Sequence, residues 1–384
     1  MIITEVKAYP VSAKAETRIT GYTSSHEDVS KLISQSFRAA YVKVETDDGT
    51  VGWGEAIVRE GGLATADIVN NLFRPVLLGQ NPLNTEVLWN KMFSMMRLRG
   101  HSYGFFVEAL SGVDMALWDV KGKSLGLPVY ALLGGKYRDS VKSYLSSIVY
   151  KDSESIGKEA SQWVDKGFRQ IKLKIGRGFE EDSRAVKAFR DSVGYDVQLM
   201  VDANTAYNPT SAIKVGRMLE KYDVSWFEEP ITPDNLEGYK EVCRALDVPV
   251  CGAETFFTKH QWKSFIAGNA VDIVQPDVAR VGGITECRKI LSLAEAYGKP
   301  VTFHVGLSGF GARAAGLHFS ANTPPDMFLN YEYYYFDNPL VSRLLRHPIE
   351  VMVGDMVKVP EGNGLGLDVN EEAVRAFCEK PAVP

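Results

Sequence analysis

Residues 169–202 read RQIKLKIGRGFEEDSRAVKAFRDSVGYDVQLMVD, which is a short apolar strand, a stretch with helical spacing and a second strand. This unit repeats, because β-rich runs recur every 22 to 30 residues from about residue 141, with helical periodicity between them. Strands and helices that alternate in this way favour right-handed crossovers and a parallel sheet, and eight strands favour a closed α/β barrel of the TIM type. The predicted strands are VKSYLSS (141–147), RQIKLKI (169–175), VQLMVD (197–202), SWFEE (225–229), PVCGAE (249–254), VDIVQPD (271–277), PVTFHV (300–305) and MFLNYE (327–332).

The residues before the barrel predict a separate α+β domain. The segment AAYVKVETDDGTVGWGEA (39–56) predicts two strands joined by a turn at Asp47-Asp48-Gly49. Helical spacing follows from about residue 64 to residue 125, and Gly126 is expected to end the last helix. After residue 348 the alternation of apolar and polar residues returns, so we expect this tail to pack back onto the first domain.

Acidic residues stand at the ends of three consecutive predicted strands. Asp202, Glu228 and Glu254 follow one another at intervals of 26 residues, one strand and one helix apart. The carboxyl ends of barrel strands meet at one mouth, so these carboxylates should converge and repel one another. A hard divalent cation with oxygen ligands, such as Mg²⁺, would remove that repulsion. Any one of the three alone is more simply a helix N-cap or a surface acid, so the prediction of a metal site depends on their common register.

Two lysines occupy one face of the second predicted strand. Lys172 and Lys174 are two residues apart, so they share a face, whereas Leu173 and its isoleucine neighbours take the other. The apolar residues indicate a central strand, which would place both ammonium groups in the barrel mouth. A lysine near a dication and a second lysine has a lowered pKa and can act as a base. The alternative is a solvated pair at the end of a sheet.

Asp277 and His304 end two consecutive predicted strands, 27 residues apart. This spacing fits a pair in which the carboxylate fixes the tautomer of the imidazole and raises its basicity. The alternative for His304 is a core histidine bonded to a backbone carbonyl.

Together these residues resemble the mandelate racemase subgroup of the enolase superfamily, whose pattern is a KxK strand, three acidic metal ligands and an Asp-His pair. The resemblance covers almost the whole chain and implies a modified (β/α)7β TIM-type barrel with an α+β capping domain, formed by the N-terminal segment and the C-terminal tail. The implied boundaries are 1–125 for the cap, 126–348 for the barrel and 349–384 for the returning tail. The stretches that carry it are IKLKIG, VDANTAY, WFEEP, CGAET, IVQPD, TFHVG, TDDGTVGWGEA and ALSGVDMALWDVKGKSLGLPVYALLGG.

The resemblance also implies a role for each residue. Lys174 and His304 would be the two acid/base catalysts, with Asp277 behind His304, while Lys172 would tune Lys174 and contact the substrate carboxylate. On the eighth strand the expected electrophile is Glu332, with Asp337 as the alternative. The implied Mg²⁺ ligands are Asp202, Glu228 and Glu254, and the implied substrate-binding residues are Lys172, Asn204, Thr20, Tyr22 and His26. Thr20, Tyr22 and His26 belong to a polar stretch that suits a polyhydroxylated ligand, although a solvated loop explains it equally simply.

The chemistry implied by the resemblance is removal of the proton α to a carboxylate. Elimination of a β-hydroxyl would then give a 2-keto-3-deoxy acid, opening of a lactone or anhydro ring would make the enzyme a cycloisomerase, and reprotonation of the same carbon would make it a racemase or epimerase. The strand ends and the stretch PEGNGLGLDVN (360–370) favour an acid-sugar dehydratase, with a sugar-lactone cycloisomerase second. A non-catalytic barrel-type binding protein would be expected to lack a ligand or catalyst, and none is missing. A phosphate-binding barrel would need a glycine-rich loop after the last two strands, where strand eight instead carries YEYYYFD.

The composition limits the possible partners. The formal net charge is −5, with 24% charged and 45% hydrophobic residues, so the expected substrate is a small carboxylate rather than nucleic acid or an anionic membrane. No apolar run has the length of a membrane span, and the four cysteines show no zinc spacing. We therefore expect a cytoplasmic protein, and a homo-oligomer as its assembly.

Overall fold

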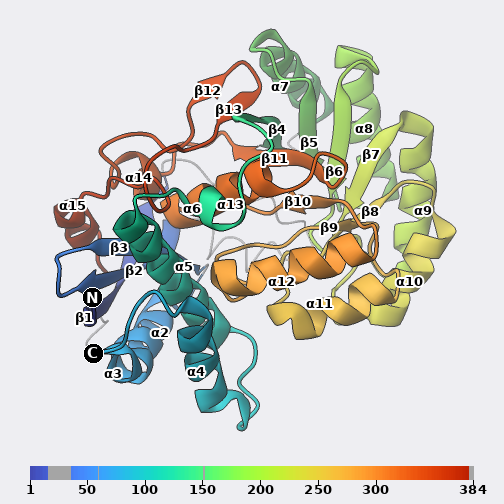
Figure 1. Ribbon diagram of the computed structural model, residues 1–384. Coiled ribbons are helices and arrows are strands. Elements are labelled where there is room, and N and C mark those ends of the chain that lie inside the picture. Colours follow the sequence, from blue (N-terminus) through green and yellow to red (C-terminus); the bar gives the residue numbers. More distant parts are fainter. Residues whose placement is uncertain (16–35, 59, 150–151, 380–384) are drawn as a thin grey trace, which may run out of the picture.

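A closed barrel of eight parallel strands forms the larger part of the computed structural model, which describes residues 1–15, 36–58, 60–149 and 152–379 (Figure 1). Strands β4 to β11 pair with their neighbours in sequence order, and β11 pairs with β4, which closes the barrel. All eight predicted barrel strands are confirmed. They are β4 (Ser140–Ile148), β5 (Gln170–Lys174), β6 (Gln198–Asp202), β7 (Val224–Glu228), β8 (Val250–Gly252), β9 (Ile273–Val274), β10 (Val301–Phe303) and β11 (Phe328–Tyr334).

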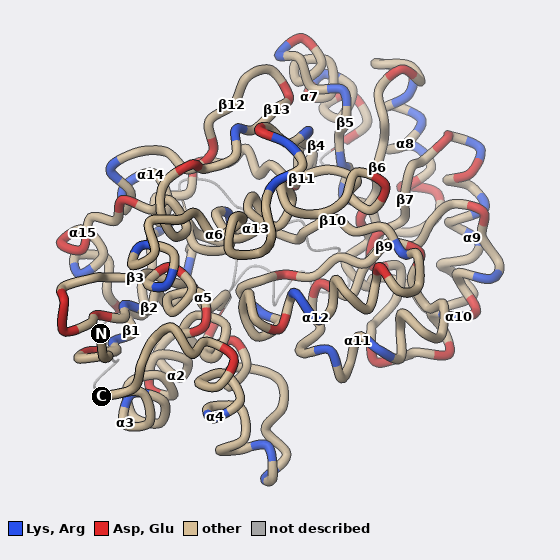
Figure 2. Tube along the Cα trace, viewed as in Figure 1, with Lys and Arg blue, Asp and Glu red and all other residues tan. Residues whose placement is uncertain are grey.

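One helix follows each of the first seven barrel strands, which is the predicted (β/α)7β arrangement. Their apolar faces pack on the outside of the barrel, and Figure 2 shows acidic and basic residues interspersed along the outer helices from α8 to α12. The helices are α7 (Ser153–Asp165), α8 (Phe179–Val193), α9 (Pro209–Leu219) with the short turn η3 (Glu220–Tyr222), α10 (Leu236–Ala245), α11 (Thr258–Ala267), α12 (Gly283–Ala296) and α13 (Phe310–Asn322).

The cap is an antiparallel sheet in the order β1-β2-β3, covered by helices. The predicted turn at residues 47–49 joins β2 to β3, and Gly49 has a φ of 80° there. Gly126 ends the last cap helix in the left-handed conformation, as predicted. The elements are β1 (Ile3–Lys14), β2 (Ser36–Thr46), β3 (Val51–Ile57), α2 (Gly62–Asp67), η2 (Ile68–Phe73), α3 (Arg74–Leu77), α4 (Thr85–Arg97) and α5 (Phe105–Leu125).

Two glycines decide how β3 lies between the cap and the barrel. A Cβ atom at Gly52 would lie 2.3 Å from the carbonyl oxygen of Ala116, and one at Gly54 would lie 2.1 Å from that of Gly112. Both partners belong to α5, so β3 can lie flat on this helix only without side chains on that face. Since side chains alternate along a strand, Trp53 and Glu55 point to the opposite face.

The chain after the barrel is shared between the two domains. β13 pairs antiparallel with β4 of the barrel. Further on, the Ser12 amide of β1 donates to the Phe377 carbonyl at 3.0 Å. The sequence pattern predicted packing on the first domain, and this is correct for the end of the tail, whereas its first hairpin extends the barrel sheet. The remaining elements are α6 (Val129–Leu132), α14 (Pro339–Ser342), β12 (Met352–Val353), β13 (Met356–Lys358) and α15 (Glu371–Ala376).

Within the described part of the chain, no helix is long and apolar enough to cross a membrane.

Candidate active site

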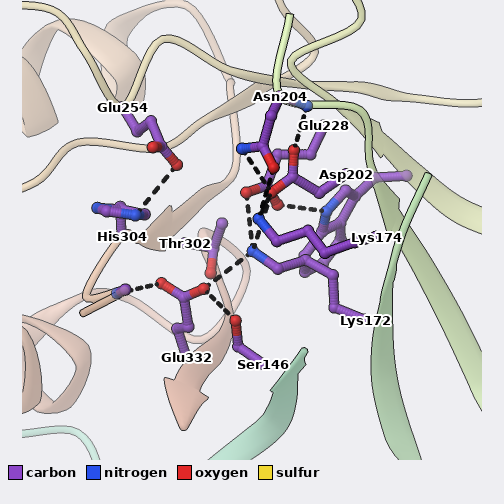
Figure 3. A network of polar contacts seen from close by, with 12 residues as sticks. Ser146, Lys172, Lys174, Asp202, Asn204, Glu228, Glu254, Thr302, His304 and Glu332 are labelled. Carbon is purple, nitrogen blue, oxygen red and sulfur yellow. Dashed lines mark hydrogen bonds and ion pairs between the residues drawn. The ribbon is translucent and has the colours of Figure 1, made fainter. Parts of the chain in front are cut away.

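The carboxyl ends of β5, β6 and β7 bring lysines and acids side by side at the barrel mouth (Figure 3). In the strand register Lys174 lies opposite Asp202, and Asp202 lies opposite Glu228. The Lys174 ammonium group donates to Asp202 and, at 2.9 Å, to the side-chain oxygen of Asn204. Both predicted lysines therefore point inward, and neither is a solvated surface group.

Lys172 is enclosed between two carboxylates of this cluster. Its side chain is 1% exposed, and its Nζ lies 2.8 Å from Glu228 and 2.9 Å from Glu332. The indole nitrogen of Trp226 donates to the other oxygen of Glu228 at 3.2 Å. Charged partners on both sides fix the position of the Lys172 ammonium group.

His304 lies across the site, just past the end of β10. Its Nδ1 is 2.7 Å from Asp277. Its Nε2 is 3.1 Å from Glu254, the contact drawn in Figure 3. Asp277 in turn accepts the backbone N–H of Ala279 at 2.8 Å, which fixes the carboxylate. This is the predicted Asp277–His304 contact, and its partner is a side chain, not the backbone carbonyl of the alternative.

Glu332 accepts four hydrogen bonds. One oxygen accepts from Lys172 and from the Ser146 hydroxyl at 2.7 Å, and the other accepts from the backbone N–H groups of Val305 and Gly306 at 2.7 and 2.9 Å. Burial opposes ionisation, but these donors and His304 hold the pKa of Glu332 well below its usual value. Asp337, the alternative, is exposed and lies beyond the end of β11.

Two family profiles match this chain in succession. Residues 26–134 match the mandelate racemase / muconate lactonizing enzyme N-terminal domain, and residues 155–373 match the enolase C-terminal domain-like family. The chain belongs to the enolase superfamily. More narrowly, it is a member of the mandelate racemase subgroup, as its sequence motifs predicted.

Three relatives illustrate the range of this subgroup. The chain is 38% identical over 346 residues to a D-galactarolactone cycloisomerase of Agrobacterium fabrum, covering 88% of this chain and 90% of the relative. It is 37% identical over 335 residues to an arabinonate dehydratase of Saccharolobus solfataricus, covering 86% and 87%. A solved racemase of Streptomyces coelicolor with bound magnesium superposes with a TM-score of 0.87 at 28% identity, covering 98% of this chain and all of that one. The first two relatives, like an L-talarate/galactarate dehydratase of Salmonella typhimurium, are acid-sugar dehydratases or cycloisomerases, so the chain falls within a group of enzymes that act on small carboxylates.

The carboxylates around the two lysines set the direction of their pKa shifts. Burial lowers the pKa of Lys174, but the attractions of Asp202, Glu228 and Glu254 together outweigh burial and raise it above the usual value. For Lys172 the attraction of Glu228 and Glu332 likewise outweighs burial, and the pKa is raised well above its usual value. The expectation of a lowered lysine pKa was made for a lysine beside a dication, so it stays a prediction for the metal-bound site.

The donor set fits a hard cation such as Mg²⁺. Burial and the negative charges of Asp202, Glu332 and Glu254 raise the pKa of Glu228 to about 7, against the attraction of Lys172. Glu254, however, turns toward His304, and no three His, Cys, Asp or Glu side chains of the described residues converge on one point. The oxygen ligands and their mutual repulsion thus suit a dication. In this arrangement Asp202 and Glu228 instead contact the two lysines.

Glu229 is a buried acid that the sequence analysis did not single out. It directly follows Glu228, has a φ of 39°, and its Oε1 has no hydrogen-bond partner among the residues described here. Burial, followed by the negative charges of Glu254, Asp202 and Glu228, raises its pKa well above the usual value. The two adjacent glutamates in WFEEP could have indicated a second acid at this strand end. The alternation of side chains along a strand, however, predicts that the second glutamate points to the other face.

Of the expected substrate-binding residues, the structure describes Lys172 and Asn204. Asn204 lies beside Lys174, with a positive φ of 43° that places its side-chain oxygen on the ammonium group. Thr20, Tyr22 and His26 lie outside the described residues.

Proposed function

We propose that this protein is a Mg²⁺-dependent carbon–oxygen lyase that removes the proton α to the carboxylate of an acid sugar and eliminates the β-hydroxyl, giving a 2-keto-3-deoxy acid. The observation that carries the proposal is the position of Lys174 and His304 on opposite sides of one buried carboxylate cluster (Figure 3). Their strands, β5 and β10, are separated by β4 and β11 on the shorter way around the barrel. A substrate carbon between them would meet one proton-transfer group on each face.

The chain's own residues divide the reaction between them. In its neutral amine form the Lys174 Nζ takes the α proton, and the His304 Nε2 gives a proton to the departing oxygen, since its Nδ1 is occupied by Asp277. The Lys172 ammonium group lies where it can contact the substrate carboxylate, and Glu332 holds it there. Asp202, Glu228 and Glu254 would hold Mg²⁺, which when bound supplies the positive charge that stabilises the deprotonated substrate.

Glu332 has a different part in this scheme from the one its family position suggested. A carboxylate that accepts four hydrogen bonds has no proton to donate to a substrate oxygen. We therefore assign it to positioning Lys172 and the loop after β10.

Cycloisomerisation is the second candidate, and the 38% identity to a D-galactarolactone cycloisomerase favours it specifically. The same two groups would act, but the leaving oxygen would belong to a ring and would stay attached to the product. Racemisation or epimerisation would follow if the second group reprotonated the α carbon. We further propose the domain boundaries 1–125, 126–348 and 349–384, a homo-oligomeric assembly, and substrate contacts from Asn204 and the polar stretch that contains Tyr22.

The test is a panel of acid sugars and their lactones with Mg²⁺, read with semicarbazide for a 2-keto acid and by NMR for ring opening or inversion. Formation of a 2-keto-3-deoxy acid from a free acid sugar supports dehydration. Consumption of a lactone with no free acid sugar reacting would replace it with cycloisomerisation. Lys174→Ala and His304→Asn serve as controls, because activity that survives in both would exclude this site.

A further inference from the structure

Glu55 of the cap strand β3 is a buried carboxylate that contacts the barrel. Its side chain is fully buried and points away from α5, because Gly52 and Gly54 leave no room for a side chain on the α5 face. The cap therefore presents one carboxyl group to the part of the barrel that follows β10, and burial raises the pKa of this group to about 7 against its bonds to Ala312 and Gly309.

Both oxygens of Glu55 hold the start of α13. The backbone N–H of Gly309 donates to one oxygen at 2.6 Å, and that of Ala312 donates to the other at 3.0 Å. The junction is tightly fitted, since a Cβ atom at Gly311 would lie 2.6 Å from the Cβ of Glu55 and one at Gly309 would lie 1.9 Å from the hydroxyl of Tyr41. Such a carboxylate between free N–H groups at a helix start binds it strongly and directionally.

The same strand holds the neighbouring loop. The Ile57 amide, two residues after Glu55, donates to the carbonyl of Ala279 at 3.2 Å. The backbone N–H of Ala279 in turn donates to the side chain of Asp277. A single cap strand therefore contacts both loops that carry the Asp277–His304 pair.

The loop from His304 to Gly309 is held at both ends. At its start the His304 amide donates to the carbonyl of Pro276 at 3.1 Å, and the next two amides donate to Glu332. At its end Gly309 is held by Glu55. Between these ends lies a short turn, in which the backbone N–H of Ser308 donates to the carbonyl of Val305 at 3.0 Å. Because the turn is short, we infer that a shift of Gly309 also shifts His304.

We propose that Glu55 is a positioning residue that orients His304 for proton transfer from across the cap–barrel boundary. The proposal rests on the proposed function, in which Lys174 and His304 serve different steps. It goes further, because the orientation of His304 then depends on the cap, whereas that of Lys174 does not.

The test compares Glu55→Gln with Asp114→Asn. The first keeps the side-chain shape but presents an amide N–H to one of the two backbone donors. The second makes the same change at a buried carboxylate of α5 that accepts the Thr285 amide at 2.8 Å, a cap–barrel bond to α12 and not to the loop after β10. Three quantities are measured in each: elimination, exchange of the substrate α proton with solvent deuterium, and amide hydrogen exchange of residues 305–312.

In Glu55→Gln we expect the ratio of elimination to α-proton exchange to fall by about 10-fold or more, because a shift of about 1 Å in a reacting group can cost about 100-fold in rate. We also expect faster amide exchange in residues 305–312. In Asp114→Asn the ratio should stay at the wild-type value even if the thermal midpoint falls. An equal loss of both reactions in Glu55→Gln, or unchanged amide exchange, would overturn the proposal.

Two further measurements cover the remaining outcomes. If Glu55→Gln does not fold, Glu55→Asp keeps the charge with a shorter reach and should change the same ratio in the same direction. If the wild-type protein converts no acid sugar, the proposed function fails. The amide exchange and the NMR signals of the His304 ring then decide the positioning role, and signals that do not move in the Glu55 variant would refute it.

Discussion

Replacing Glu332 by glutamine tests whether this residue is an ionised anchor or a neutral proton donor. The substitution keeps the shape of the side chain and removes its charge. One of its two ends must then present an N–H₂ group to donors, either to Lys172 and Ser146 or to the two backbone amides of the loop after β10. If Glu332 is ionised in the folded enzyme, glutamine cannot satisfy both sets.

The magnitude follows from the contacts that are lost. Leaving a buried donor unpaired costs about 1–3 kcal/mol, and breaking a buried ion pair by removing one partner costs about 3–5 kcal/mol. Glu332 is 1% exposed, so solvent does not weaken these terms. Since Lys172 keeps Glu228 at 2.8 Å, we expect no more than the range for one broken buried ion pair, a loss of about 3–5 kcal/mol in the free energy of unfolding.

The assay is denaturant unfolding of both proteins, together with kcat/KM once a substrate is in hand. Glu286→Gln is the matched control, because Glu286 is a fully buried glutamate that accepts a backbone amide and a lysine, both of Lys259, at the start of the outer helices α11 and α12. It should lose stability without losing kcat/KM per folded molecule. If Glu332→Gln unfolds with wild-type stability, then the residue is neutral in the folded protein, and its assignment as an anchor is refuted.

Four other predictions concern the metal, the catalysts and the pH dependence of stability. Mg²⁺ at about 100 times its dissociation constant should add about 2.7 kcal/mol to the free energy of unfolding, and EDTA should abolish both this gain and turnover. Lys174→Ala and His304→Asn should each lower kcat by about 10²- to 10⁴-fold with unchanged circular dichroism; wild-type rates in both would contradict the assignment. Asp277→Asn should lower elimination more than α-proton exchange, and an equal loss would argue against a leaving-group role for His304. Burial lowers the pKa of His318 to about 4, so the unfolded chain binds a proton first, and stability present above pH 6.5 should be lost as the pH falls toward 4. The loss should reach about 3 kcal/mol in the wild type and be absent in His318→Asn, whose side-chain oxygen takes the place of Nδ1 and can accept the backbone N–H of Tyr130.

The barrel could be predicted from the sequence because its signal repeats. Each strand is a short apolar run between amphipathic helices, and eight repetitions leave few other folds. The tail was harder, because an alternating segment such as residues 351–360 shows that a strand forms but not which sheet it joins. In the structure β13 pairs with β4, a contact across more than 200 residues that no local pattern encodes.

The placement of the site residues followed from the same repetition. Strand ends in register bring Lys174, Asp202 and Glu228 together, and this needed only the strand assignments. The contact of Glu55 with the loop after β10 could not be predicted in this way, because in the sequence Glu55 is only part of GWGEA in a different domain. Its place behind the barrel mouth depends on how closely β3 approaches α5, a property of packing that residue types along the chain do not reveal.

The direction of the lysine pKa shifts also depends on the three-dimensional structure and cannot be derived from the sequence pattern alone. Two lysines on one strand face suggest mutual repulsion and lowered pKa values, and Lys172 does act in that direction on Lys174. Coulomb energy, however, falls with distance, and a carboxylate in direct contact outweighs a like charge further away. Lys174 is paired with Asp202, and Lys172 lies between Glu228 and Glu332. The residue types fix which charges share the site, whereas the sign of each shift depends on which neighbour is nearest, and that is decided only when the strands are in register.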